Sequence, residues 1–185
     1  MRHLVLLSVL ATATFFVGGC SRAIGEGAGL VLGAKGTYIP TQPLAASKEA
    51  RPLGAYRRFE LGPITDGIGG KVPAGLLGYL PAELDSQLRS KKLPNDPAGK
   101  TLVLRGEIIH YESADLVGIA LGPLEQVIVR MEMVDKETGS VLAVANCVGR
   151  TKEGVNLGVK SKAQGLAKAI AGWIDNRYPQ DQRVD

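Results

Sequence analysis

The chain has few of the residues that build most active sites. Among its 185 residues are two cysteines, Cys20 and Cys147, and two histidines, of which His110 lies outside the first 19 residues. A lone histidine gives little support for a His-based metal site or a Ser-His-Asp triad. If Cys20 is modified, Cys147 has no partner in the chain, so we expect no disulfide framework. We expect Cys147, which lies in an alternating apolar run, to be a small buried side chain.

The sequence also has only a small excess of positive charge and few long apolar runs. The net charge is +4, and the basic residues are spread along the chain apart from Arg57-Arg58 and Lys91-Lys92. This distribution argues against nucleic-acid binding. One apolar run stands out, Leu4 to Val17, with 14 residues. It matches the apolar part of an export signal and is shorter than the ~20 residues that a membrane-spanning helix needs.

The most specific motif follows this run. Val17-Gly18-Gly19-Cys20 resembles the lipobox of bacterial lipoproteins, in which an aliphatic and two small residues precede an acylated cysteine. The resemblance implies that residues 1–19 are a signal peptide, that cleavage falls between Gly19 and Cys20, and that Cys20 carries palmitate-like acyl chains in a membrane. Ser21 favours, by analogy, the periplasmic side of the outer membrane. An ordinary secretory signal with an incidental cysteine is the alternative.

Residues 20–55 are rich in glycine, alanine and proline, and we expect them to form a lipidated tether. Gly25, Gly29 and Gly33 fall four residues apart, so a short packing helix remains open as an alternative. We expect the folded domain to span residues 56–178, and residues 179–185 to form a C-terminal tail.

Hydrophobic periodicity predicts the elements of this domain. A strand at 57–61 should end at Gly62-Pro63. A helix over 74–92 should place Pro81 in the first turn of its main part. Further strands are expected at 102–111, 126–134 and 141–148, the last two joined by a hairpin at 135–139, and a second helix at 161–178.

The predicted fold class is therefore α+β, a two-layer mixed sheet in the order β-α-β-β-β-α with both helices packed on one face. The hairpin should leave an open edge strand that can pair with a partner strand. Apolar side chains beside that edge would extend the surface, namely Ile128, Val134, Leu142 and Val144. The alternative is that loops or the tether cover this edge.

No set of residues builds a convincing catalytic site. Glu107 and Glu112 lie five residues apart and should point to opposite faces of a strand. Glu132 alternates with Arg130 and suits an ion pair, and Asp135 and Glu137 fall in a turn. Two stretches superficially resemble phosphate loops but lack the full spacing, Gly67–Lys71 and Gly158–Ser161. We therefore expect no enzyme, no catalytic residue, no metal and no cofactor.

The stretch from Gly75 to Trp173 resembles a family of small bacterial envelope lipoproteins. The matching segments are LPAELDSQLRSKKL, LVLRGEIIHY, VRMEMVDKETGSVL and AKAIAGWI. That family is similar to auxiliary lipoproteins of envelope transport systems and to the amino-terminal domain of the Tol-system propeller protein. The resemblance implies a non-catalytic interaction or assembly role with an envelope protein partner. A carrier of a small apolar or lipidic ligand is the alternative, and a deep apolar cavity would favour it.

Overall fold

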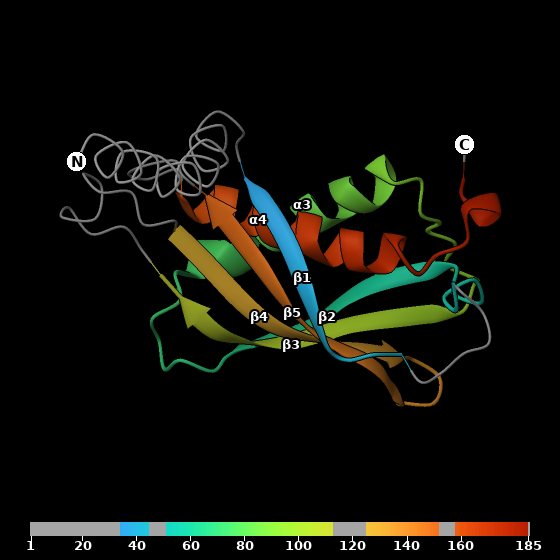
Figure 1. The fold of residues 1–185 in the computed structure, drawn as a ribbon, viewed down its shortest axis with the longest axis horizontal. Coiled ribbons are helices and arrows are strands. Elements are labelled where there is room, and N and C mark those ends of the chain that lie inside the picture. Colours follow the sequence, from blue (N-terminus) through green and yellow to red (C-terminus); the bar gives the residue numbers. More distant parts are fainter. Residues whose placement is uncertain (1–33, 45–50, 113–124, 152–157, 185) are drawn as a thin grey trace, which may run out of the picture. The chain divides into compact units, whose positions relative to one another are not determined.

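One mixed sheet of five strands is the centre of the computed structural model, which describes residues 34–44, 51–112, 125–151 and 158–184 (Figure 1). The strands are β1 (Lys35–Gln42), β2 (Arg58–Asp66), β3 (Thr101–Tyr111), β4 (Glu125–Asp135) and β5 (Val141–Thr151). Their spatial order is β1-β5-β4-β3-β2. β2 and β3 run parallel, and every other pair of neighbours is antiparallel.

Two helices, α3 (Ala74–Ser90) and α4 (Gly158–Asp175), lie side by side on one face of this sheet (Figure 1). The predicted α+β class, the parallel crossover through α3 and the antiparallel hairpin are confirmed. No helix in the described part of the chain is long and apolar enough to cross a membrane.

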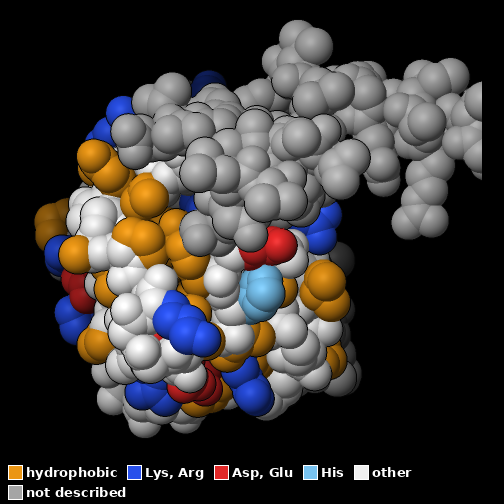
Figure 2. Space-filling model, turned by 90° about the vertical axis from the view of Figure 1, so that its left-hand side faces the viewer, with side chains coloured by type: hydrophobic (Ala, Val, Ile, Leu, Met, Phe, Trp, Pro, Cys, Tyr) orange, Lys and Arg blue, Asp and Glu red, His pale blue; other side chains and the backbone are white. Residues whose placement is uncertain are grey.

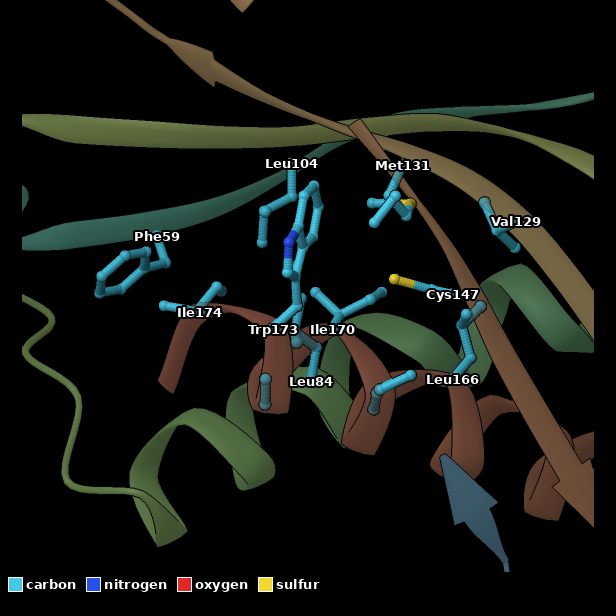
Figure 3. Close-up of a cluster of buried hydrophobic side chains, with 14 of the residues drawn as sticks. Phe59, Leu84, Leu104, Val129, Met131, Cys147, Leu166, Ile170, Trp173 and Ile174 are labelled. Atoms are coloured by element: carbon cyan, nitrogen blue, oxygen red, sulfur yellow. The ribbon is translucent and has the colours of Figure 1, made fainter. Parts of the chain in front are cut away.

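The core lies between the sheet and the helices and follows from the alternation of the strands. Every second side chain of β4 faces the helices and is fully buried, namely Val127, Val129, Met131 and Met133. Ala143, Ala145 and Cys147 of β5 do the same with small side chains. Trp173, Ile170 and Leu166 of α4 fill the space opposite them (Figure 3). Burial of this apolar face holds the two layers together.

The expected start of the fold near Tyr56 is wrong, because residues 35–42 of the presumed tether form strand β1. Tyr38 of β1 lies beside Trp173, with 6.5 Å between ring centroids, and Asn176 Nδ2 donates a hydrogen bond to its hydroxyl at 2.7 Å. Gly36 lets β1 lie directly against the α4 backbone at Gly165. Pro40 hides this strand in the sequence, yet proline is tolerated in an edge strand. The possible helix at Gly25–Gly33 falls outside the described residues.

Strand β2 also departs from expectation, since it does not end at Gly62-Pro63. It continues to Asp66, and the pairing with β3 shifts register between Leu61 and Ile64. A β-bulge takes up the proline, which is possible because β2 is the other edge of the sheet.

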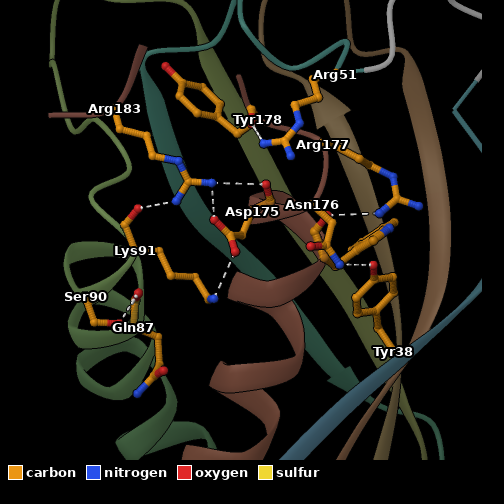
Figure 4. A network of polar contacts seen from close by, with 11 residues as sticks. Tyr38, Arg51, Gln87, Ser90, Lys91, Asp175, Asn176, Arg177, Tyr178 and Arg183 are labelled. Atoms are coloured by element: carbon orange, nitrogen blue, oxygen red, sulfur yellow. Dashed lines mark hydrogen bonds and ion pairs between the residues drawn. The ribbon is translucent and has the colours of Figure 1, made fainter. Parts of the chain in front are cut away.

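The helix boundaries differ in two places. Helix α3 begins at Ala74, so Pro81 lies inside the helix and not in its first turn. Helix α4 ends at Asp175, and the C-terminal residues are docked onto the fold. Asp175 accepts ion pairs from Lys91 at 3.0 Å and from Arg183 at 2.5 Å (Figure 4). The lysine and arginine hold the pKa of the Asp175 carboxyl below its ordinary value against the opposing effect of burial.

Candidate functional site

The predicted docking edge at the hairpin is not an open edge, which corrects the sequence-based expectation. β4 lies between β3 and β5, and β1 pairs with β5 from Val144 to Arg150, which leaves only its first residues beside the hairpin without a partner in β1. The alternative, in which tether residues cover the edge, is the arrangement that the structure has. Val134 and Val144, expected to be sticky surface, are 5% and 4% exposed. The strands with one unpaired side among the described residues are β1 and β2.

The sheet face opposite the helices is polar at its centre. Arg105 Nε of β3 and Glu132 Oε2 of β4 form an ion pair at 2.8 Å, so Glu132 is confirmed as an ion-pair residue. Its partner is the cross-strand Arg105 and not Arg130. Arg130 is the register partner of Glu107 in the same region. Together with Thr65 these side chains line a shallow depression of about 360 Å³. Opposite charges already balance there, so the depression offers no excess charge to a ligand.

The expectation that Glu107 and Glu112 point to opposite faces is also corrected. The β3–β4 pairing shifts register between Ile108 and His110, and this bulge reverses the alternation of side chains beyond it. Glu112 Oε2 lies 3.9 Å from Nε2 of His110, whose register partner is Ile128. The two carboxylates have different neighbours, Arg130 for Glu107 and His110 for Glu112.

Asp135 at the start of the hairpin turn is the most strongly perturbed acid of the described residues. Its Oδ1 accepts the backbone N–H groups of Glu137 and Thr138 at 3.0 and 3.1 Å, which confirms the predicted local role. Its Oδ2 contacts Lys100 Nζ at 2.7 Å and accepts the Tyr56 hydroxyl at 2.8 Å. Hydrogen bonds from Lys100 and Tyr56 hold the Asp135 pKa well below its usual range. Burial and the adjacent carboxylate raise the Tyr56 pKa.

This cluster ties the turn to the chain before β2 and has a structural explanation. Sequence analysis missed Tyr56 and Lys100 because they lie 79 and 35 residues from Asp135, and no local pattern links such distant positions. The only sequence indication was the Asp at the first position of a turn.

Both stretches that resemble phosphate loops already hold a carboxylate of the protein. In Gly67–Lys71, the Asp66 carboxylate accepts the N–H groups of Ile68 at 2.9 Å and Gly70 at 2.7 Å. In Gly158–Ser161, a Cβ on Gly158 would clash with Glu125 Oε2, so the Glu125 carboxylate lies against the first residue of α4. A phosphate would meet a carboxylate of the protein at each place.

Lys162 is a buried cation that sequence analysis did not single out. Its side chain is 1% exposed, and its Nζ lies 2.6 Å from Glu125 Oε2 and 4.3 Å from the Tyr111 ring centroid. It also donates to the Glu112 carbonyl at 2.6 Å. A lysine so fully satisfied fixes the start of α4 against β3 and β4 and is not available as a reactive amine.

Cys147 is buried, as predicted, and burial in apolar surroundings raises the pKa of its thiol. It is therefore not a reactive nucleophile. Gly19 and Cys20 lie outside the described residues. Within the described ranges, no three His, Cys, Asp or Glu side chains come together as a possible metal site.

A second hollow lies between β2 and α3. It is a groove of about 350 Å³ with an apolar floor that includes Phe59, Leu84 and Leu88. The charged side chains on its rim pair with each other, Arg58 with Glu60 at 3.0 Å and Arg89 with Asp85. The groove is open to solvent, and the interior between sheet and helices is filled with side chains (Figure 3).

The chain matches no family model and no curated protein. Among solved structures it is similar to the PelC dodecamer from Paraburkholderia phytofirmans, with 17% identity, a TM-score of 0.50, and 78% of this chain and 99% of that chain covered. Protein XCC0632 from Xanthomonas campestris has 12% identity and a TM-score of 0.42 over 74% of this chain and 92% of that chain. A minor lipoprotein from Acinetobacter baumannii has 14% identity and a TM-score of 0.35 over 63% and 94%. The PelC likeness shows a shared fold.

Proposed function

We propose that this chain is the precursor of a lipid-anchored protein of the bacterial cell envelope whose folded domain acts by contact with partners and not by catalysis. Cleavage before Cys20 and acylation of its thiol attach the domain to a membrane. The support for the anchor is the motif Val17–Cys20 after a 14-residue apolar run. By analogy with lipoprotein sorting, Ser21 supports the periplasmic side of the outer membrane as the location in this proposal.

The observation that carries the contact role is the filled space between sheet and helices. Trp173, Leu166 and Leu84, from both helices, are at most 2% exposed in that layer. A carrier of a lipid-sized ligand needs a largely preformed apolar cavity. The two hollows described above are instead open to solvent and rimmed by internally paired charges.

Self-association is one form that such contact can take. PelC, the fold-similar protein, is described as a dodecamer. The sheet here has two different edges, β1 and β2, and pairing of unlike edges between copies is a head-to-tail contact that can close into a ring. The mass of the purified, acylated protein in detergent tests this form directly. A monomer at all concentrations would leave a different envelope protein as the partner.

The anchor is tested by metabolic labelling with a fatty acid. Cys20→Ala should abolish the acyl label and leave the precursor uncleaved, whereas the matched variant Cys147→Ala should keep the label. Undiminished label in Cys20→Ala would refute the anchor. In-cell crosslinking of the anchored protein then identifies what the domain contacts.

A carrier role is the second candidate, and the β2–α3 groove is its one support. Phe59, Leu84 and Leu88 would contact a small apolar ligand there. Leu88→Glu on the groove wall should weaken binding of an apolar fluorescent probe if the groove is a ligand site. A probe that binds equally to the parent and to Leu88→Glu would remove this candidate.

A further inference from the structure

The chain enters the folded unit at a defined end. Ala34 leads into β1, and Lys35 at its start is the register partner of Arg150 near the end of β5. Helices α3 and α4 also begin at this end, where a methyl group on Gly75 would lie 3.6 Å from Val159. β2 and β3 run parallel to each other, and both also end at this side of the sheet. We call this region the entry end.

An anchor at Cys20 would limit how far the entry end can lie from the membrane. Residues 20–33 connect the two, and these 14 residues extend over at most about 50 Å. The entry end is therefore confined to within that distance of the bilayer surface.

We propose that the entry end is a lipid-contacting surface that rests on the headgroups of a bilayer containing anionic lipid. This rests on the lipid anchor proposed above. The chemistry that would recognise the bilayer is a set of cations without an ion pair to a described residue, placed around exposed apolar side chains.

The cations come from several elements of the entry end. Lys35 and Arg150 are direct cross-strand partners. Lys71 precedes α3, and Lys160 lies in the first turn of α4. All four are exposed, and none forms an ion pair with a described residue. Like charges directly opposite each other repel, so Lys35 and Arg150 are better accommodated beside an anionic surface.

The acidic groups of this end do not cancel that charge. Asp66 is held by the N–H groups of its own loop, and Glu125 is neutralised by the buried Lys162. Glu112 lies nearest to His110. The Glu107 carboxylate lies against Gly67 and has the cross-strand Arg130 as its register partner. Among the described residues, Asp66 and Glu112 are then left to face the four cations.

The opposite end of the domain provides the contrast. Lys91 and Arg183 both pair with Asp175, and Lys100 pairs with Asp135. Lys136 in the hairpin pairs with a carboxylate as well, Glu60 at 2.7 Å. These four cations of the opposite end each pair with a carboxylate, whereas the four cations of the entry end have no ion pair with a described residue.

Apolar side chains are exposed among the free cations. Tyr79 of α3 is 46% exposed and Ile109 of β3 is 41% exposed. Ile109 lies in the β3 bulge, and bulges re-aim side chains at strand ends. Partly buried Ile68 and Val72 lie in the loop that joins β2 to α3. Figure 2 views this end and shows hydrophobic side chains interspersed with lysine and arginine. Tyrosine and aliphatic groups next to cations suit the interface of a bilayer.

The test places a polarity-sensitive fluorophore at either end of the acylated full-length mature protein. Ile109→Cys reports on the entry end, and Val184→Cys is the matched control. Val184 is also aliphatic and is 43% exposed, and its backbone N–H donates a hydrogen bond to the Lys92 carbonyl at the opposite end. Buried Cys147 should not react with the label. The protein is reconstituted in vesicles of phosphatidylethanolamine and phosphatidylglycerol that contain a nitroxide-labelled lipid. Quenching should be several-fold stronger at Ile109→Cys and should fall in vesicles of phosphatidylcholine alone.

A charge variant tests the lipid-contacting surface independently of the lipid anchor. Each cation near an anionic surface contributes a factor of about five to contact, so Lys71→Glu should reduce the contact equilibrium at least about five-fold. Lys92→Glu is the control, because Lys92 is also exposed and has no ion pair with a described residue. High salt should reduce quenching in the same way.

Each outcome decides the proposal. Acylated protein that floats with the vesicles but shows equal quenching at both labels overturns the lipid surface and leaves the anchor intact. Protein without acyl chains overturns the anchor and with it this proposal. A label at Ile109→Cys that is shielded in native membranes and not in protein-free vesicles means that a protein covers the entry end, which also overturns the lipid surface.

Discussion

Strand β1 provides the sharpest test of the fold, because it lies in a segment whose composition predicts a tether. Gly36 of β1 has no room for a side chain. A methyl group there would lie 2.5 Å from Ala169 N and closer still to the Gly165 carbonyl oxygen, both of them backbone atoms of α4. Backbone atoms within a packed helix move less readily than the end of a flexible side chain. Overpacking of this kind costs about 1–3 kcal/mol.

We therefore expect Gly36→Ala to lower the free energy of unfolding by that amount. For a unit of this size each kcal/mol lowers Tm by roughly 2–4 °C, so the expected loss is between about 2 and 12 °C. Circular dichroism during thermal and urea denaturation of the mature protein measures it. Near-ultraviolet ellipticity from Trp173 should change as well, because Tyr38 of β1 lies beside that ring.

The matched control is the same substitution at Gly172 of α4. A methyl group at Gly172 meets no atom within 4 Å, and the residue is helical. Replacing a helical glycine by alanine stabilises by about 0.8–1 kcal/mol, so Gly172→Ala should raise Tm. If the two variants shift Tm in the same direction by similar amounts, β1 is not packed on α4 and the reasoning is refuted.

Three further outcomes follow from buried polar and sulfur groups. Cys147→Ser should reduce the free energy of unfolding by about 1–3 kcal/mol, since a hydroxyl replaces a thiol in apolar surroundings; rapid alkylation of native Cys147 would contradict its burial. Asp135→Asn should lower the free energy of unfolding at neutral pH, and its difference from the parent in that free energy should shrink below about pH 4. The reason is that the folded state lowers the Asp135 pKa, so the stability that the carboxylate contributes is present above the unfolded-state pKa and is lost as pH falls. A pH-independent difference in urea titrations would contradict this. Lys162→Met leaves Glu125 buried without its partner and should cost about 3–5 kcal/mol, part of which Glu125→Leu in the same chain should restore. No recovery in that double variant would mean that the ion pair is not what holds α4.

The residues that sequence reasoning placed correctly are those whose environment repeats along the chain. Val129, Met131 and Met133 alternate with Arg130 and Glu132, and the leucines of α3 recur at spacings of three and four. Such periodicity reflects burial of one face, which local sequence records directly. Cys147 was placed by the same argument, and its burial is confirmed.

The errors lie where a local pattern competes with a distant contact. Pro40 and Pro63 indicate irregular chain, yet both stand in edge strands that a neighbouring strand stabilises. The bulge after Ile108 reverses the faces of the residues beyond it, which no alternation count can foresee. The partners of Asp135 and Glu132 come from strands or loops remote in sequence.

By itself, the sequence determined the two-layer α+β class, the helices and the three central strands, because periodicity is a local property; it also carries, at Val17–Cys20, the motif on which the proposed anchor rests. The tertiary structure decided that residues 35–42 complete the sheet, that a carboxylate lies at each apparent phosphate loop, and that Lys35 and Arg150 become direct partners where the chain enters the sheet. These features depend on which strands become neighbours. Neighbours are chosen by packing across the whole core, and Gly36 of β1 can meet Gly165 of α4 only after both layers have formed.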